Sequence, residues 1–140
     1  MAATEFETYR GMAYPWLCDS MGHMNTQHYA AMYDTAGFHF LSRVMPYVVL
    51  SKSGLGWADV RQVIEYRQEV RAGTLLVVCS RLARLGGKSI TYVHEMRNAE
   101  TGTVHSTCET VTVLFDLEKR AAVPLTDAIR ARGREMGVEG

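Results

Sequence analysis

The sequence predicts an α+β fold in which a five-stranded antiparallel sheet packs against one long helix, with a short helix at the C-terminal end. Residues 26–48 place apolar side chains at intervals of three and four, which is the period of one face of a helix. Residues 60–116 hold four runs rich in β-branched and aromatic residues, which favour strands. Short segments that contain Gly or Asn separate these runs, as in antiparallel hairpins.

The first strand is expected at residues 5–14, where apolar and polar residues alternate until Pro15. The long helix begins near Asn25 or Thr26, because either side chain can accept a hydrogen bond from an unpaired N–H of the first turn. Three helix breakers downstream predict where the helix ends: Pro46, Gly54 and Gly56. The helix therefore follows the first strand after a short loop.

The four later strands are expected at residues 60–70, 74–85, 88–97 and 104–116. The turns between them are expected at Ala72–Gly73, Gly86–Gly87 and Asn98–Gly102. These turns are short enough for hairpins, so each strand is predicted to pair with the next in an antiparallel meander. Pro124 then precedes the short terminal helix, with Thr126 or Asp127 near its start.

Composition limits the classes of function. The 140 residues are 47% hydrophobic, which suits one domain over residues 1–140 with its own core. Lys and Arg balance Asp and Glu at 15 each, so no overall field attracts nucleic acid or an anionic membrane. No window approaches the roughly 20 apolar residues of a membrane span. The three cysteines lack CxxC spacing, which argues against disulfides or zinc and favours a reduced, cytoplasmic protein.

A polar loop separates the first strand from the long helix. Residues 19–25, DSMGHMN, bring an Asp, a Gly, a His and an Asn together. Unpaired N–H groups in a helix's first turn carry the positive end of its dipole, so they could polarise a carbonyl oxygen near Thr26. Asp19 could attack that carbonyl or activate water, and Gly22 permits a sharp turn. This set suits attack on a carbonyl group; the alternative is that Asp19 only stabilises the turn.

The pattern D-x-x-G-H-x-N-x-x-x-Y, from Asp19 to Tyr29, and the order of the elements resemble the 4-hydroxybenzoyl-CoA thioesterase branch of the hotdog-fold acyl-CoA thioesterases. The resemblance covers nearly the whole chain. It implies that Asp19 is the catalytic carboxylate, that Gly22 is the turn glycine, and that the backbone N–H near Thr26 binds the thioester. One position departs from the family pattern, because many members carry a second acid where this chain has Leu17.

The resemblance also implies an acyl-CoA substrate, so coenzyme A enters as part of the substrate and no cofactor is expected. Substrate contacts are expected from two groups of residues: His23, Asn25, Tyr29 and Tyr33 near the helix, and Gly86, Gly87, Lys88 and Ser89 in a hairpin. The two glycines leave backbone amides open and Lys88 supplies charge for phosphates, although an ordinary hairpin has the same sequence pattern. His23 and Asn25 could instead pin the loop through hydrogen bonds.

The remaining titratable residues suggest no further site. Four other histidines lack metal-ligand spacing, so packing roles are expected and no metal is assigned: His28, His39, His94 and His105. Asp34 lies off the apolar face of the helix, where an exposed position is expected and a role as a substitute acid is the weaker alternative.

Assembly and two other functions stay open at this point. One helix can cover only one face of the sheet, so a homodimer or homotetramer is expected, with sheets that continue across subunits. Enoyl-thioester hydratases of the hotdog fold usually pair an Asp with a His, and Asp19 with His23 is the nearby pair in this loop. If Asp19 only stabilises the turn, a noncatalytic domain that binds acyl thioesters is the remaining alternative.

Overall fold

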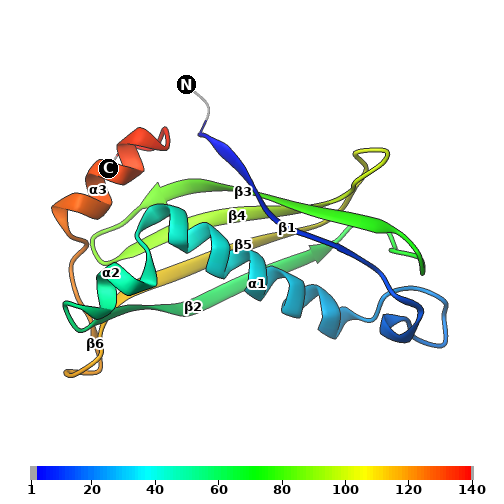
Figure 1. Ribbon diagram of the computed structural model, residues 1–140, viewed down its shortest axis with the longest axis horizontal. Coiled ribbons are helices and arrows are strands. Elements are labelled where there is room, and N and C mark those ends of the chain that lie inside the picture. Colours follow the sequence, from blue (N-terminus) through cyan, green and yellow to red (C-terminus); the bar gives the residue numbers. More distant parts are fainter. Residues whose placement is uncertain (1–2, 140) are drawn as a thin grey trace.

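The computed structural model describes residues 3–139 and shows an antiparallel sheet that curls around one long helix (Figure 1). The strands are β1 (Glu5–Met12), β2 (Leu55–Tyr66), β3 (Leu75–Leu85), β4 (Ser89–Asn98), β5 (Val104–Asp116) and the short β6 (Ala121–Ala122). The helices are α1 (Thr26–Val44), α2 (Tyr47–Ser51) and α3 (Asp127–Glu135), with a 3-10 turn, η1, at Pro15–Leu17. The α+β class, the five long strands, the long helix and the terminal helix are confirmed, and the arrangement is that of the hotdog fold.

The strand order is β1-β3-β4-β5-β2, with β6 paired to the end of β5. The hairpins that join β3 to β4 and β4 to β5 are confirmed. The predicted meander is wrong at Ala72–Gly73, because β2 pairs with β5 whereas β3 pairs with β1. Residues 67–74 instead cross the sheet, and long-range contacts hold them: the Met24 N–H donates to the Val70 carbonyl at 2.7 Å, and the Gly73 N–H donates to the residue after β1. Local turn residues do not reveal such contacts.

Two boundaries differ from the prediction. α1 ends at Val44 rather than near Val48, because Pro46 has no N–H with which to continue the helix, and α2 starts directly after it. β2 begins and ends earlier than the expected range 60–70, so Gly56 lies inside a strand instead of marking the end of the helix. The short elements η1, α2 and β6 were not predicted.

The core lies between α1 and the sheet. One face of α1 is buried along its whole length, at Tyr29, Met32, Tyr33, Ala36, Gly37, Phe40 and Val44. The N-terminal half of this face packs against Val78, Met96 and Cys108. The C-terminal half packs against Leu82, Ile90 and Ile129. The helix period read from the sequence is therefore the period of the buried face, and the polar face of α1 is left for solvent or ligands.

The C-terminal end of α1 is closed by α3 (Figure 1). Thr126 caps α3, because its hydroxyl accepts a hydrogen bond from the Ile129 N–H at 3.2 Å. Gly133 allows close contact with β3, since a Cβ at that position would lie 2.6 Å from Leu85 Cδ1. The Arg130 guanidinium donates to the Gly86 carbonyl at 2.9 Å and so ties α3 to the β3–β4 hairpin. No helix within residues 3–139 is long and apolar enough to cross a membrane.

Candidate active site

The loop before α1 holds Asp19 in a tight turn. The Gly22 N–H donates to the Asp19 carbonyl at 3.0 Å, and Gly22 has a φ of 83°, which is strained for residues with a side chain. The Met21 N–H donates to Asp19 Oδ1 at 2.9 Å, so backbone geometry fixes the orientation of the carboxylate. The other oxygen, Oδ2, is therefore the one directed at a neighbour or a ligand.

His23 is that neighbour. Its Nδ1 lies 3.9 Å from Asp19 Oδ2, which is too long for a direct hydrogen bond, and both side chains are 25% exposed. The Asp19 N–H donates to the His23 carbonyl at 3.0 Å, which closes the turn on itself. The sequence motif thus places a carboxylate and an imidazole side by side at the surface, where both can meet a small molecule.

The first turn of α1 begins directly after this loop. Asn25 is its cap, because its Oδ1 accepts from the Gln27 N–H at 3.1 Å, which confirms one of the two predicted caps. Asn25 therefore pins the helix start and does not pair with His23. Thr26 is exposed and is the first residue of α1, so its N–H belongs to the group that has no acceptor within the helix. The helix dipole adds positive potential at this N–H.

A pocket of about 190 Å³ opens at the start of α1. It is lined by His23, Met24, Thr26, Tyr29, Tyr66, Arg67, Gln68 and Glu69. The Tyr29 ring meets the Tyr66 ring edge to face at 4.9 Å, and burial raises the pKa of Tyr29. His23 and Thr26 both face this pocket, and Asp19 contacts His23. A carbonyl group bound here would have a helix N-terminus on one side and a carboxylate nearby.

The structure does not bring all the candidate residues together in one chain. The hairpin Gly86–Ser89 lies at the opposite end of α1 from Asp19 (Figure 1), and the 19 residues of α1 span about 28 Å. The carbonyls of Gly86 and Gly87 accept hydrogen bonds from Arg130, while Lys88 is exposed. A pantetheine contact at this hairpin is therefore separate from the Asp19 loop within one protomer.

Tyr33 belongs to the core rather than to the pocket at the start of α1. Its side chain is fully buried and stacks on His94, with ring centroids 5.5 Å apart. Asp34, one residue further along α1, is exposed as predicted. It lines a second pocket further along α1, together with Tyr33.

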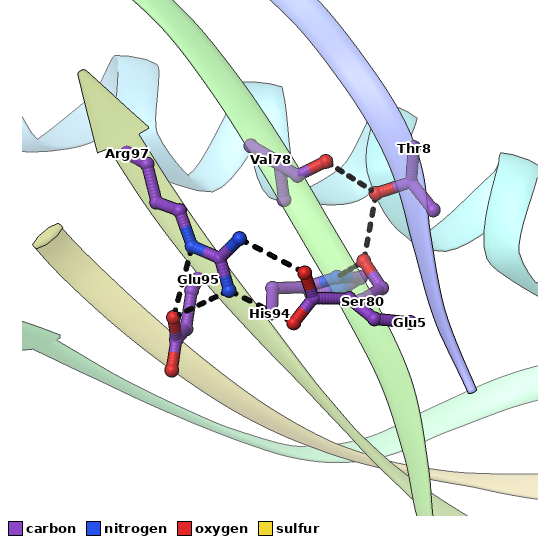
Figure 2. Close-up of polar contacts among 7 residues, drawn as sticks. All are labelled: Glu5, Thr8, Val78, Ser80, His94, Glu95 and Arg97. Atoms are coloured by element: carbon purple, nitrogen blue, oxygen red, sulfur yellow. Dashed lines mark hydrogen bonds and ion pairs between the residues drawn. The ribbon is translucent and has the colours of Figure 1, made fainter. Parts of the chain in front are cut away.

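A buried polar chain was missed by the sequence prediction (Figure 2). Thr8 Oγ1 lies 2.7 Å from Ser80 Oγ, and Ser80 Oγ lies 2.5 Å from His94 Nδ1. Burial lowers the pKa of His94 to about 4, so the imidazole is neutral near pH 7. Although a Ser–His contact is a common nucleophile arrangement, Ser80 is fully buried and cannot meet a substrate carbonyl. This chain ties β1, β3 and β4 together.

A charged cluster on the outer face of the sheet joins two of the same strands (Figure 2). The Arg97 guanidinium donates to both carboxylate oxygens of Glu5, at 2.9 and 2.8 Å, and also to Glu95. These bonds hold the pKa of Glu5 below its usual range. The cluster joins β1 to β4 across β3, which explains it as a structural contact.

Comparison with known proteins adds a family and a set of similar folds. The family model of the thioesterase-like superfamily matches residues 14–133. No curated protein matches the sequence. A hypothetical protein from Staphylococcus aureus, solved in complex with CoA, has a TM-score of 0.84 at 14% identity, covering 97% of this chain and 85% of that chain.

Two further solved structures are similar over nearly their full lengths. A probable thioesterase from Escherichia coli has a TM-score of 0.79 at 21% identity, covering 95% of this chain and 96% of that chain. A 1,4-dihydroxy-2-naphthoyl-CoA thioesterase from Synechocystis has a TM-score of 0.78 at 18% identity, covering 95% and 98% of the two chains. At these identities the likeness is one of fold.

Proposed function

The chain belongs to the thioesterase-like superfamily and is a thioester hydrolase, and on that premise we propose that it converts an acyl-CoA and water to a free carboxylic acid and CoA at the Asp19 loop. Two observations together carry this proposal. The Asp19 carboxylate lies 3.9 Å from the His23 imidazole, and His23 lines the same pocket as Thr26, the first residue of α1. No metal or cofactor takes part in the proposed reaction, since coenzyme A is part of the substrate.

The proposed chemistry divides between the carboxylate and the helix. The thioester oxygen accepts a hydrogen bond from the Thr26 N–H, which stabilises the negative charge that develops on it. Asp19 either attacks the carbonyl carbon or takes a proton from the water that does so. The bond from carbon to sulfur then breaks. In the general-base route the leaving thiolate takes the proton that Asp19 removed from water. In the nucleophilic route the acyl group stays on Asp19 as an anhydride, water hydrolyses it to the free acid and the Asp19 carboxylate, and the proton released goes to the thiolate. Gly22 supports this by shaping the turn that presents Asp19.

Two similarities support coenzyme A as the carrier. One similar fold was solved in complex with CoA, and another is a thioesterase for an aromatic acyl-CoA. For this chain we propose that Tyr29 and His23 line the acyl end and that Gly86, Gly87, Lys88 and Ser89 of a neighbouring subunit meet the pantetheine arm. That assignment accounts for the length of α1 that separates the two groups within one protomer.

We further propose a homodimer or homotetramer. β2 is an edge strand, so its outer row of backbone N–H and C=O groups is open to pairing with another chain. It also exposes Val60 and Val63, apolar residues that a second copy would cover. Sedimentation at micromolar concentration tests the assembly, and a monomer would contradict it.

The test of the function is thiol release from a panel of saturated, branched and aromatic acyl-CoAs by the native protein and by Asp19→Asn. Asparagine keeps the Oδ1 that accepts from Met21 while it removes the charge, so folding should be unchanged. We expect turnover to fall by at least about 10²-fold. Asp127→Asn, at an exposed position in α3, is the matched control and should keep full activity.

An enoyl-thioester hydratase is the second candidate, because Asp19 and His23 lie side by side as that chemistry needs. Loss of enoyl absorbance without thiol release would favour it over hydrolysis. Binding of acyl-CoA with neither product would instead favour a noncatalytic binding domain. Thiol release that persists in Asp19→Asn would contradict the catalytic assignment of Asp19.

A further inference from the structure

The pocket at the start of α1 has a second wall that carries its own carboxylate. One wall comes from the Asp19 loop and the first turn of α1, and the other comes from the end of β2 and the crossing segment at residues 67–74. The second wall includes Glu69. Because Asp19 lies 3.9 Å from His23 on the first wall, the pocket has a carboxylate near each of its two walls.

Backbone contacts hold the chain on both sides of Glu69. The Gln68 N–H donates to the His105 carbonyl at 3.1 Å, and the Gln68 carbonyl lies 3.1 Å from His105 Nδ1. His105 is buried, so this anchor is packed into the protein. On the other side, the Val70 carbonyl accepts from the Met24 N–H at 2.7 Å. Glu69 therefore reaches the pocket from a fixed backbone.

The Glu69 side chain has one oxygen held and one free. The Arg71 Nε donates to Glu69 Oε1 at 3.3 Å, and within residues 3–139 this carboxylate has no second hydrogen bond. The side chain is 49% exposed, so water reaches it. Burial raises the pKa of the Tyr29 hydroxyl most, and the negative charge of Glu69 adds to that rise, which places this charge near the first turn of α1. The free Oε2 is an acceptor for a water molecule in the pocket.

Asp19 and Glu69 suit different steps of a reaction. The Asp19 carboxylate is short and is fixed by the Met21 N–H, which suits a group that attacks one carbon atom. Glu69 is longer and open to solvent, which suits a group that takes a proton from water. We propose that Asp19 is the nucleophile and that Glu69 is the general base that activates water in a second step. This rests on the proposed function, because it takes attack on an acyl-CoA bound at Thr26 as the first step.

The reaction then has two steps, and each carboxylate acts in one of them. In the first step Asp19 Oδ2 attacks the thioester carbon, the bond from carbon to sulfur breaks, and CoA leaves as a thiolate. In the second step the oxygen of water attacks the acyl carbon of the resulting anhydride while Glu69 takes one proton from that water. The bond from the acyl carbon to Asp19 breaks, which gives a carboxylic acid and the Asp19 carboxylate. The proton on Glu69 then passes to the thiolate of CoA.

Glu69→Gln separates the two steps. Glutamine keeps an oxygen that accepts from Arg71 and removes the base, so Asp19 is still acylated but water is not activated. We expect a rapid release of about one thiol per active site, followed by steady turnover at least about 10²-fold slower than that of the native protein. Mass spectrometry of the intact protein after a rapid acid quench should show the bound acyl group. Asp19→Asn should show neither the burst nor the acyl group.

Hydroxylamine tests whether a base is what Glu69→Gln lacks. It attacks acyl groups at neutral pH without a base, so it should restore turnover of this variant and give the acyl hydroxamate, measured above the rate without protein. Glu65→Gln is the matched control, because Glu65 also pairs with an arginine two residues away but lines a separate pocket on the other face of the sheet. It should keep the native turnover and show no burst.

The results separate this inference from the proposed function. If the native protein releases no thiol, or if release persists in Asp19→Asn, the proposed function and this inference both fail. If turnover depends on Asp19 but Glu69→Gln works at the native rate, this inference alone fails. Slow turnover of Glu69→Gln without a burst, or without restoration by hydroxylamine, would also overturn it. Glu69→Asp, which keeps a carboxylate, should turn over faster than Glu69→Gln, and an equal rate in the two variants would contradict the role of a base.

Discussion

His23 and His94 place the same side chain in two opposite environments. His23 lies in an open loop, near a carboxylate and at the edge of a pocket. His94 lies in the core with a short contact to Ser80, stacked against Tyr33. If distance alone were the criterion, the Ser80–His94 pair would be chosen as the catalytic one. Burial reverses that choice, because a catalytic group must reach the substrate before its chemistry matters.

Because of this difference, substitutions near the two histidines should change different measured quantities. Changes around His94 should alter the free energy of unfolding and its pH dependence. Changes around His23 should alter turnover and leave the free energy of unfolding nearly constant.

The largest expected effect is on acid stability. Burial lowers the pKa of His94 to about 4, below the ordinary 6.5, so between these pH values the unfolded chain binds a proton that the folded chain does not. Stability is therefore full above about pH 6.5 and falls as the pH drops toward 4, with a loss of about 2 kcal/mol by pH 4.5. His94→Asn can keep a contact with Ser80 and removes this titration. Urea unfolding of both proteins at about pH 6.5 and about pH 4.5 should show a smaller loss of unfolding free energy in the variant.

An equal loss of stability in native protein and His94→Asn would mean that other groups dominate acid unfolding. His39→Asn, at an exposed position on α1, is the control and should keep the native pH dependence.

Ser80→Ala comes next. It removes the hydroxyl that joins Thr8 to His94 and leaves the buried His94 Nδ1 without a partner, while Thr8 Oγ1 keeps its bond to the Val78 carbonyl, at a cost of about 1–3 kcal/mol. Chemical denaturation should show this destabilisation, whereas thiol release per folded molecule should stay within about threefold of the native value. If folded Ser80→Ala lost as much activity as Asp19→Asn, the Ser80–His94 pair would be catalytic. Its assignment to a purely structural role would then be wrong.

His23→Asn should lower turnover and leave stability unchanged. The imidazole lies 3.9 Å from the Asp19 carboxylate, so its loss should disturb the position and proton exchange of that group. We expect kcat to fall about tenfold, which corresponds to about 1.4 kcal/mol of transition-state stabilisation, with an unchanged midpoint of thermal unfolding. A wild-type rate in this variant would restrict the site to Asp19 and the helix terminus.

The smallest effect is expected from the helix cap. Asn25→Ala removes the acceptor of the Gln27 N–H and should cost about 1 kcal/mol of stability. Asn25→Asp keeps an acceptor at the same place and should cost little. Thermal unfolding of the two variants measures the cap. If both variants lost stability equally, the amide group of Asn25 would have a role besides capping.

Much of the fold could be predicted because it depends on local signals. The spacing from Tyr29 to Val44 gave the buried face of α1, and Thr126 marked the start of α3 correctly. The pairing of β2 could not be predicted, because Ala72–Gly73 has the composition of a hairpin turn whether or not the flanking strands meet. Val70 was assigned to a strand for its apolar side chain, yet it is buried in the connection between strands.

The candidate site also combines features that depend on local sequence with features that depend on long-range contacts. The turn at Asp19 and Gly22 and the cap at Asn25 are local features, so residue order was enough to expect them. The contact of Ser80 with His94 depends on which strands are neighbours. The second pocket, lined by Asp34 and Asp59, likewise needs α1 and β2 in place before these carboxylates share a cavity. Alternation within one strand marks which face a residue occupies but not what lies opposite.

The crossing segment at residues 67–74 has a consequence for the order of folding. β3, β4 and β5 are joined by short hairpins and can form early, whereas β1 and β2 must find partners far along the chain. The Asp19 loop is held to this segment through the pairing of His23 with Arg71 and of Met24 with Val70. The proposed catalytic loop therefore takes its shape only when the slow, long-range steps are complete. A partly folded chain that keeps its central hairpins would have no active site.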